Sequence, residues 1–333
     1  SHSMSSSPFH PGSLRDTSFL VTGGSGFIGS NIVHYLVRHQ AGKIRILDNL
    51  LTSSIANLEP YLNLPNVEFI EGDIRDLDTC HKACKGIDLV THQAALGSVP
   101  RSVRDPLATH AINATGFLNM LIAARDAGVK RFVYASSSSV YGDHPVLPKR
   151  EDETGNPLSP YAVSKKTNEL YARVFAETYG MQIMGLRYFN VFGPNQSPDG
   201  PYAAVIPLFM KAALDKTAPN IDGDGEQTRD FTFVENAVQA NIRALFTPDP
   251  EANNRVYNVA IGERITVNEL YDIIAELTGS EVRPTYRERR AGDIRDSLAD
   301  ISLAKKHLGY QPTVRIREGL QQTLAWFRQT VGQ

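Results

Sequence analysis

The segment Val21–Ser30, VTGGSGFIGS, decides the fold of this chain. A β-branched run precedes it, a helical pattern follows it, and Gly23, Gly26 and Gly29 are spaced G-x-x-G-x-x-G between the two. Glycines at such a strand–helix turn let the backbone approach a pyrophosphate, which the helix N-terminus then faces. The segment therefore predicts a βα unit that binds a dinucleotide.

Strand-like and helix-like segments alternate on both sides of this turn. The expected strands are SFLVTG, IRILDN, VEFIEGD, DLVTHQAA, RFVYASS and MQIMGLRYF. The expected helices span residues 31–40, 76–85, 107–127 and 161–179. Runs of Val and Ile separated by helices are typical of βαβ units with a parallel sheet covered on both faces. We therefore predict the α/β class, with a Rossmann-type, doubly wound parallel sheet.

The pattern changes after residue 189, which predicts a second domain. Residues 190–207 are rich in Pro and Gly and show little periodicity, so we expect a long structured loop there. We assign a Rossmann domain to residues 14–189 and a smaller mixed α/β substrate-binding domain to residues 190–333. Segments near 230–261 are expected to return to the first domain.

Composition excludes several classes of protein. Lys and Arg number 34 against 36 Asp and Glu, a net charge of −2, which argues against a polyanion or an anionic membrane as partner. No apolar run approaches the roughly 20 residues of a membrane span. The start lacks the apolar core of a secretory signal, and its SHSM resembles the remnant of an expression tag. Cys80 and Cys84 are expected to be reduced thiols of a cytoplasmic protein.

Two acidic positions indicate which dinucleotide is bound. Asp48 closes the second expected strand 19 residues after Gly29, near the spacing at which a carboxylate holds an adenosine ribose. This carboxylate accepts from both ribose hydroxyls and repels a 2′-phosphate, so NAD is favoured over NADP. Asp73 and Ile74 follow the third strand and are expected beside the adenine.

A second constellation indicates proton transfer. Tyr161 and Lys165 lie at i and i+4, on one face of an expected helix. A lysine ammonium one turn away stabilises a tyrosine phenolate, which makes the tyrosine a usable base near neutral pH. The serines at 136–139 end an expected strand, where parallel sheets place their ligands. One of these hydroxyls is expected to bridge substrate oxygen and phenolate.

These motifs together resemble the extended short-chain dehydrogenase/reductase family. The resemblance rests on TGGSGFIGS, DN at 48–49, GDIRD, HQAA, SSSSVYGD, the YxxxK pair and LRYFNVFGP, and it extends from about residue 18 to the C-terminus. Within the family the chain most resembles UDP-hexose 4-epimerases. HQAALGSVPRS, YGDHPVLPK and GPYAAVIP look closest to the branch that acts on UDP-N-acetylhexosamines.

The resemblance implies roles for individual residues. It makes Tyr161 the base, Lys165 its activator, and Ser137 the catalytic serine. The further cofactor contacts implied are Phe27, Ile28, Asn49, Gln93, Ala94, Ala95 and Tyr188. The substrate contacts implied are Gly97, Ser98, Ser138, Ser139, Asn190, Ala204, Val205, Arg229, Arg290, Asp293 and Ser297. Arg229 and Arg290 would hold the diphosphate, because a guanidinium fork fits phosphate oxygens. Asp293 would contact the uridine ribose.

The implied reaction interconverts UDP-GlcNAc and UDP-GalNAc through a 4-keto sugar, with NAD retained between turnovers. Ser297 aligns with a position beside the sugar 2-substituent, where a bulky aromatic residue would exclude an acetamido group. Serine leaves that space open, and Gly97 and Ala204 add small walls. Small walls permit an N-acetyl group without requiring it, so UDP-glucose and UDP-galactose are also possible substrates.

Three other functions were weighed. A 4,6-dehydratase carries Thr-Asp-Glu where this chain has Ser137–Ser139, which disfavours dehydration. A UDP-uronate 4-epimerase remains open, although no dedicated cation for a C6 carboxylate is evident in the sequence. A non-enzymatic NAD or nucleotide-sugar sensor would not need the Tyr, Lys and Ser set.

Metal binding and association are the remaining expectations. We predict no metal site, because the nine histidines show no ligand spacing. The resemblance implies a homodimer, for which the helices at 107–127 and 161–179 are the candidates.

Overall fold

The computed structural model describes residues 7–291 and 293–330 of the 333-residue chain, so the tag-like SHSM lies outside the described part. The folded chain begins before residue 14, the start expected from the sequence. Phe9 is buried and its ring stacks on that of Tyr35, with 5.5 Å between the centroids. Its backbone N–H also donates to the Tyr35 hydroxyl at 2.8 Å. Burial of this aromatic ring extends the first lobe towards the N-terminus.

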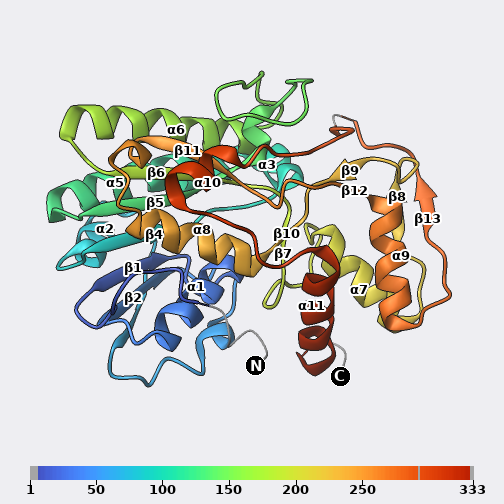
Figure 1. Cartoon of the computed structure of the whole chain (residues 1–333), viewed down its shortest axis with the longest axis horizontal. Helices are drawn as coiled ribbons and strands as arrows, with labels where there is room; N and C mark the ends of the chain where they lie inside the picture. Colours follow the sequence, from blue (N-terminus) through green and yellow to red (C-terminus); the bar gives the residue numbers. More distant parts are fainter. Residues whose placement is uncertain (1–6, 292, 331–333) are drawn as a thin grey trace.

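A parallel sheet forms the centre of the molecule (Figure 1). Its seven strands within the described residues are β1 (Ser18–Thr22), β2 (Lys43–Asp48), β3 (Val67–Glu71), β4 (Leu89–His92), β5 (Arg131–Ser137), β6 (Ile183–Tyr188) and β11 (Arg255–Val259). The spatial order is β3-β2-β1-β4-β5-β6-β11. The direction of winding reverses between β1 and β4, and such a switch point is where doubly wound sheets bind ligands. The Rossmann-type fold is confirmed.

The register aligns the carboxyl ends of these strands along one edge. Thr22 of β1 pairs with both Leu47 and His92, and Ser137 of β5 pairs with Tyr188 of β6. The residues that directly follow these strands therefore gather at a single edge of the sheet.

Two layers of helices cover the sheet. One layer contains α2 (Leu77–Cys84), α3 (Val99–Arg104), α4 (Pro106–His110), the π-helical turn η3 (Ala111–Thr115), α5 (Gly116–Ala127) and α6 (Pro160–Tyr179). The other contains α1 (Phe27–Arg38), α8 (Val234–Phe246) and α10 (Ser302–Leu308). The stretch 106–127 is long and apolar enough for a membrane span, yet more than half of it is buried against its neighbours, as in a core helix of a folded domain.

A second lobe lies beside the carboxyl edge of the sheet (Figure 1). It contains α7 (Val205–Asp215), α9 (Val267–Thr278) and α11 (Ile316–Thr330) around a separate apolar core. Its short strands pair as β7 (Val191–Phe192) with β10 (Thr232–Phe233), β8 (Asn220–Asp222) with β13 (Thr285–Arg287), and β9 (Thr228–Arg229) with β12 (Ile265–Thr266). Short 3-10 turns occur at η2 (Ile55–Leu58), η4 (Ser138–Tyr141) and η5 (Pro250–Ala252).

The later part of the chain crosses between the lobes. β11 pairs with β6 as the outermost strand of the large sheet. Both α8 and α10 pack on that sheet, and α8 also contacts β7 and β10 of the second lobe. The chain therefore returns to the first lobe over a longer stretch than 230–261, because α10 at 302–308 is also included. The loop expected over 190–207 ends earlier, since α7 begins at Val205.

Candidate active site

The glycine turn is sterically closed around its own backbone. Gly23 has φ +67°, and a Cβ there would lie 2.7 Å from the backbone nitrogen of Ala94. A Cβ on Gly29 would lie 2.1 Å from the Gly23 carbonyl oxygen. Gly26 is the N-cap of α1. Side chains at Gly23 and Gly29 would therefore force the turn apart. Because both residues are glycine, the turn stays tight and the N-terminus of α1 is accessible to a phosphate.

Phe27 and Ile28 differ from the glycines in what they contact. Both are partly buried on the first turn of α1 and pack against the core of the second lobe. Neither lines the cavity beside the glycine turn. At these two positions only the backbone N–H groups can therefore bind a dinucleotide. The two side chains connect the first lobe with the second.

Asp48 is held at the end of β2 with its carboxylate towards this cavity. One oxygen accepts from the Ser25 N–H at 3.1 Å and the other from the Leu50 N–H at 2.9 Å. Each carboxylate oxygen keeps a further lone pair. The cavity wall also contains Gly23, Gly26, Asn49, Ile74, Gln93, Ala94 and Ala95. The predicted cofactor residues are therefore brought together, and they suit an adenosine ribose and pyrophosphate.

Asp73 lies at the margin of the cavity and is already paired. Arg75 binds its carboxylate, with a shortest distance of 2.6 Å, and the Asn49 amide donates to it at 3.4 Å. The Arg75 hydrogen bonds hold the pKa of Asp73 below its usual value. Ile74 is buried against Gly116 of α5, where an added Cβ would lie 2.5 Å from the isoleucine side chain.

A closed set of hydrogen bonds fixes Gln93 and Tyr188. The Tyr188 hydroxyl donates to the Gln93 Oε1 at 2.7 Å and accepts from the Asn241 Nδ2 at 2.9 Å. Asn241 Oδ1 accepts from Gln93 at 3.1 Å and from Thr91 at 2.9 Å. Sequence reasoning missed Asn241 and Thr91. Asn241 lies on α8, more than 50 residues beyond Tyr188, so no local spacing could have linked them.

The proton-transfer residues meet on the inner face of α6. Lys165 is buried, its Nζ donates to the Ala135 carbonyl at 3.0 Å, and it lies 5.9 Å from the centre of the Tyr161 ring. Burial raises the pKa of Tyr161, and its hydrogen bond with Ser137 opposes that rise. Burial also lowers the pKa of Lys165 to about 8, with Glu169 acting in the opposite direction. From the sequence we expected Lys165 to lower the pKa of Tyr161. In the structure burial has the larger effect and raises that pKa.

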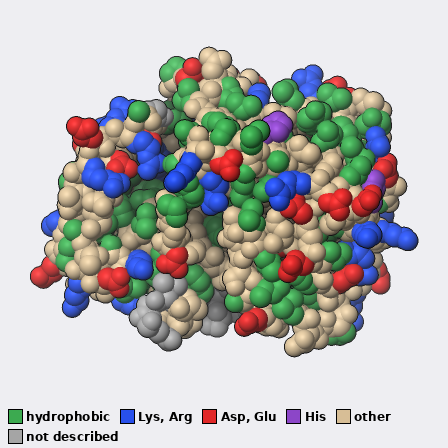
Figure 2. Space-filling view, turned by 180° about the vertical axis from the view of Figure 1, so that it is seen from behind, with side chains coloured by type: hydrophobic (Ala, Val, Ile, Leu, Met, Phe, Trp, Pro, Cys, Tyr) green, Lys and Arg blue, Asp and Glu red, His purple; other side chains and the backbone are tan. Residues whose placement is uncertain are grey.

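The second lobe contributes a large cavity of about 730 Å³. Six of the predicted substrate residues line it: Asn190, Ala204, Val205, Arg229, Arg290 and Asp293. Figure 2 shows the surface hollowed on the side of this lobe, with basic side chains along the rim. Arg287, Asp222 and Gln227 also line the cavity and were missed. Asp222 and Arg287 lie on three-residue strands without readable periodicity, and Gln227 lies in the loop before β9.

The two predicted diphosphate arginines differ in their contacts. Arg229 donates to the Thr228 carbonyl at 2.7 Å and the Ile294 carbonyl at 2.7 Å, so much of its guanidinium holds the backbone beside the cavity. Arg290 is exposed and lies 3.7 Å from Asp222, which Arg287 also contacts at 2.9 Å. Arg290 and Arg287 are thus the more available cations of this wall.

The remaining predicted substrate residues lie outside the lining of the large cavity. Ser98 has φ +83° and caps α3. Ser137 caps the short η4 turn by accepting from the Ser139 N–H at 3.1 Å. The Ser139 hydroxyl is buried and meets no partner among the described residues. Ser138 lies beside it in η4, next to α6.

Gly97 and Ser297, which the sequence predicts beside the sugar, are not in the lining of the large cavity. An added Cβ on Gly97 would meet no atom within 4 Å, so the absence of a side chain leaves open space there. Ser297 donates its backbone N–H to the Thr228 carbonyl at 3.1 Å, which attaches the 293–299 segment to β9.

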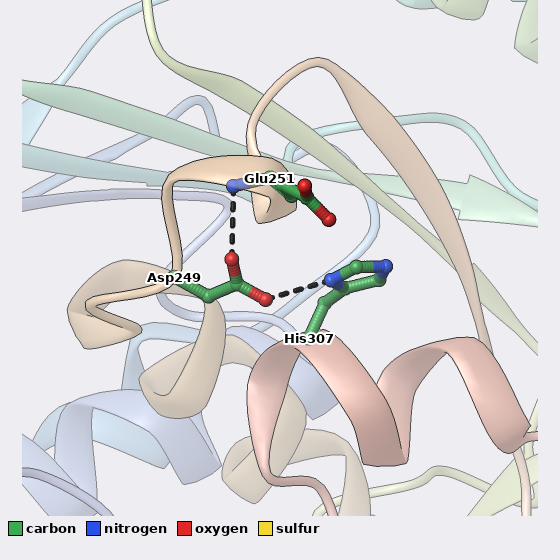
Figure 3. A group of neighbouring side chains, drawn as sticks. All are labelled: Asp249, Glu251 and His307. Carbon is green, nitrogen blue, oxygen red and sulfur yellow. Dashed lines mark hydrogen bonds and ion pairs between the residues drawn. The ribbon is translucent and has the colours of Figure 1, made fainter.

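One group of possible metal ligands occurs within the described residues, away from both cavities. Figure 3 shows Asp249 directed at both other members, His307 of α10 and Glu251 of η5. Asp249 bonds the His307 Nδ1 at 2.7 Å and accepts from the Glu251 N–H at 2.9 Å. Asp249 is partly buried and Glu251 is exposed. The hydrogen bonds account for the arrangement as a connection between η5 and α10.

The two buried cysteine thiols are unreactive near neutral pH. Cys80 and Cys84 are free thiols without measurable exposure, and burial raises the pKa of each to about 12. A thiol with such a pKa has almost no thiolate near neutral pH.

Comparison with known proteins agrees with this geometry. Residues 19–260 match the NAD dependent epimerase/dehydratase family. The chain belongs to this family. A UDP-N-acetylglucosamine 4-epimerase from Methanobrevibacter ruminantium M1, solved in complex with UDP-N-acetylmuramic acid, is 42% identical, with a TM-score of 0.90 over 95% of this chain and 100% of that chain.

Other members of the epimerase/dehydratase family span a range of sugars. A UDP-glucose 4-epimerase of Mycolicibacterium smegmatis is 37% identical over 311 residues, 93% of this chain and 98% of the relative. MoeE5, solved with UDP-glucuronic acid and NAD, is 34% identical, with a TM-score of 0.83 over 94% of this chain and 100% of that chain. NAD is therefore the cofactor, and the protein belongs among the UDP-sugar 4-epimerases of this family.

Proposed function

We propose that this protein interconverts UDP-GlcNAc and UDP-GalNAc by inverting the configuration at C4. The observation that carries the proposal is the convergence of Tyr161, Lys165 and Ser137 on the sheet edge that also bears the glycine turn and Asp48. A proton acceptor and a dinucleotide site at one edge are the requirements for oxidation and re-reduction of a secondary alcohol.

Each residue has a defined task in this reaction. Tyr161 accepts the O4 proton as the C4–H bond breaks, and it returns that proton to the opposite epimer. NAD, when bound, accepts the C4 hydride and gives it back, so no external oxidant is consumed. Lys165 stabilises the Tyr161 phenolate, and Ser137 holds the substrate oxygen beside it by hydrogen bonding.

Inversion requires the 4-keto sugar to turn over while the nucleotide stays in place. Arg290, with Arg229 behind it, suits the role of diphosphate anchor because both line the large cavity. Asp293 lies on the same wall and suits the uridine ribose. A loosely held sugar end is what rotation about the diphosphate requires.

The N-acetyl preference rests on the space around the sugar. Gly97, Ala204 and Ser297 are small, and nothing would contact a Cβ placed on Gly97. Similarity to the M. ruminantium enzyme supports the same assignment.

Replacement of the proposed base tests the assignment of roles. We expect Tyr161→Phe to lose epimerase activity by at least about 10³-fold while NAD remains bound, because only the proton acceptor is removed. NAD content after purification and product formation by NMR give the two readouts. Full activity in this variant would remove Tyr161 from the role of base.

A UDP-uronate is the second candidate substrate, favoured by one cation that the sequence did not reveal. The Arg101 guanidinium lies 4.7 Å from the centre of the Tyr202 ring, and its buried Nε meets no acceptor among the described residues. Tyr202 precedes Ala203 and Ala204 of the cavity wall, which supports a role for Arg101 near the sugar. Turnover of UDP-glucuronate by the wild type, lost in Arg101→Gln while UDP-GlcNAc turnover persists, would favour this candidate.

A further inference from the structure

A buried ion pair lies behind the proton-transfer residues and has no part in the mechanism above. Glu169 of α6 and Arg187 of β6 form two parallel hydrogen bonds, with N–O distances of 2.7 and 2.8 Å. Their side chains are 7% and 3% exposed. Bidentate geometry at this depth makes the pair rigid and directional.

The pair also involves the strand that carries the catalytic serine. Ser136 of β5 donates to the Glu169 Oε2 at 2.6 Å, so the carboxylate binds β5 and β6 at once. Arg187 donates further to the Glu151 carbonyl at 3.0 Å and lies 4.9 Å from the centre of the Tyr141 ring. One carboxylate therefore connects α6 with the carboxyl ends of two neighbouring strands.

The chain neighbours of these residues are the proposed reacting groups. Ser136 precedes Ser137, and Glu169 follows Lys165 by one helical turn and Tyr161 by two. A shift of α6 along the sheet would move Tyr161 and Lys165 away from Ser137, and Glu169 opposes that shift.

We propose that Glu169 is a positioning residue for proton transfer, which fixes the register of α6 through Ser136 and Arg187 and stabilises the Lys165 ammonium by its charge. This role rests on the proposed function of Tyr161 and Lys165.

The charged and titratable surroundings support the electrostatic part of this role. Lys165 faces His92 of β4, whose pKa burial lowers to about 3, so that this imidazole is neutral near pH 7. Tyr134 of β5, beside Glu169, also stays neutral because burial raises its pKa. Glu169 is the group that raises the pKa of Lys165 against its burial.

The test replaces the pair without leaving a lone buried charge. Glu169→Gln alone would leave Arg187 as a lone buried charge, whereas replacement of both partners by uncharged residues leaves none. We therefore use the double variant Glu169→Gln/Arg187→Met. The control is Glu177→Gln, which removes an exposed pair with Arg173 on the same helix.

Three readouts are predicted for the double variant. We expect kcat to fall about 10- to 100-fold from misplacement, with little change in KM. Loss of the Glu169 charge lowers the pKa of Lys165, so the alkaline limb of the kcat profile moves to lower pH. Crystal structures of the NAD-loaded proteins are expected to show a lengthened contact between Lys165 Nζ and the Ala135 carbonyl, while Glu177→Gln matches the wild type in all three readouts.

Two results would overturn the proposal. One is a folded double variant with wild-type kcat, alkaline limb and Lys165 contact. The other is a loss of kcat that follows thermal stability while the alkaline limb and the contact stay unchanged, which indicates a purely structural pair. Failure of the proposed function would give a different result, because the wild type itself would then not epimerise any UDP-sugar. The contact between Lys165 Nζ and the Ala135 carbonyl could still be compared between the wild type and the double variant.

Discussion

At the scale of single residues, the buried Lys165 ammonium of the proton-transfer site lowers the free energy of unfolding. Its ammonium is buried with one carbonyl partner, and burial lowers its pKa from 10.5 to about 8. Below pH 8 the folded protein holds a charge that the unfolded chain would hydrate more easily. The unfolded state binds more protons between about pH 8 and 10.5, so this residue costs stability at neutral pH and the cost declines as pH rises through that window.

Lys165→Met separates stability from activity. We expect this variant to be more stable than the wild type by about 1–3 kcal/mol at neutral pH, because a buried ammonium is removed. We also expect epimerisation to fall by at least about 100-fold, because the Tyr161 phenolate loses its counter-charge. Urea unfolding and product NMR measure the two effects, and lower stability together with retained turnover would contradict this account of Lys165.

Ser297 is the residue-scale test of sugar selectivity. We expect Ser297→Tyr to lower kcat/KM for UDP-GlcNAc by about 10- to 200-fold and to affect UDP-glucose much less, because the phenol ring would fill the acetamido space. Ser302→Tyr, on α10, serves as the control for added bulk. Intact turnover of UDP-GlcNAc by Ser297→Tyr would show that this position does not limit the N-acetyl group.

At the scale of elements, Asn258 shows what attaches the last strand to the site. It is fully buried on β11 and donates to the Lys149 and Asp300 carbonyls at 2.9 Å each. It also accepts from the Tyr141 hydroxyl. These bonds hold the segment that follows Ser137–Ser139 against β11.

Asn258→Ala tests this attachment. We expect a loss of about 2–4 kcal/mol, because two buried carbonyls and a hydroxyl lose their partners. Asn253→Ala is the matched control. The Asn253 Oδ1 is buried and has no partner within residues 7–291 and 293–330, so its removal should be nearly neutral. The variants are compared by their denaturant midpoints at a common m-value. Equal losses in the free energy of unfolding at both positions would contradict the role given to the Asn258 hydrogen bonds.

The same scale separates what the sequence predicts from what it misses. β1 to β6, α1 and α6 were expected from their apolar runs and helical patterns, within a few residues of their observed bounds. α8 was not expected as a helix, although its residues 236–242 are all buried. The β8–β13 pair joins segments about 65 residues apart, which local patterns cannot show. The catalytic residues could be predicted because their signals are local. Tyr161 and Lys165 share one helix, and Ser137 ends a predicted strand.

At the scale of the whole molecule, the net charge of −2 conceals a local arrangement. Arg229, Arg287, Arg290 and Lys211 line the large cavity together with Asp215, Asp222 and Asp293. Near neutrality overall is compatible with a diphosphate site built from a few cations, and it disfavours long polyanions.

The outer surface carries an apolar face that we propose as a homodimer interface. Eight large hydrophobic side chains on α3, α4 and α6 are exposed: Val99, Val103, Leu107, Val163, Leu170, Tyr171, Val174 and Tyr179. We expect light scattering to give twice the chain mass for the wild type and a single chain mass for Leu170→Glu/Val174→Glu. Val146→Glu, exposed elsewhere, should remain dimeric. A monomeric wild type would refute the interface.

The most direct test of the central claim follows the hydrogen at C4. UDP-GlcNAc labelled with deuterium at C4 is incubated with the purified protein without added NAD, and the products are resolved by NMR. The account predicts UDP-GalNAc that retains deuterium at C4, because the hydride leaves and returns within one active site. A 4-keto-6-deoxy sugar, deuterium exchanged with solvent, or no turnover of UDP-GlcNAc would contradict it.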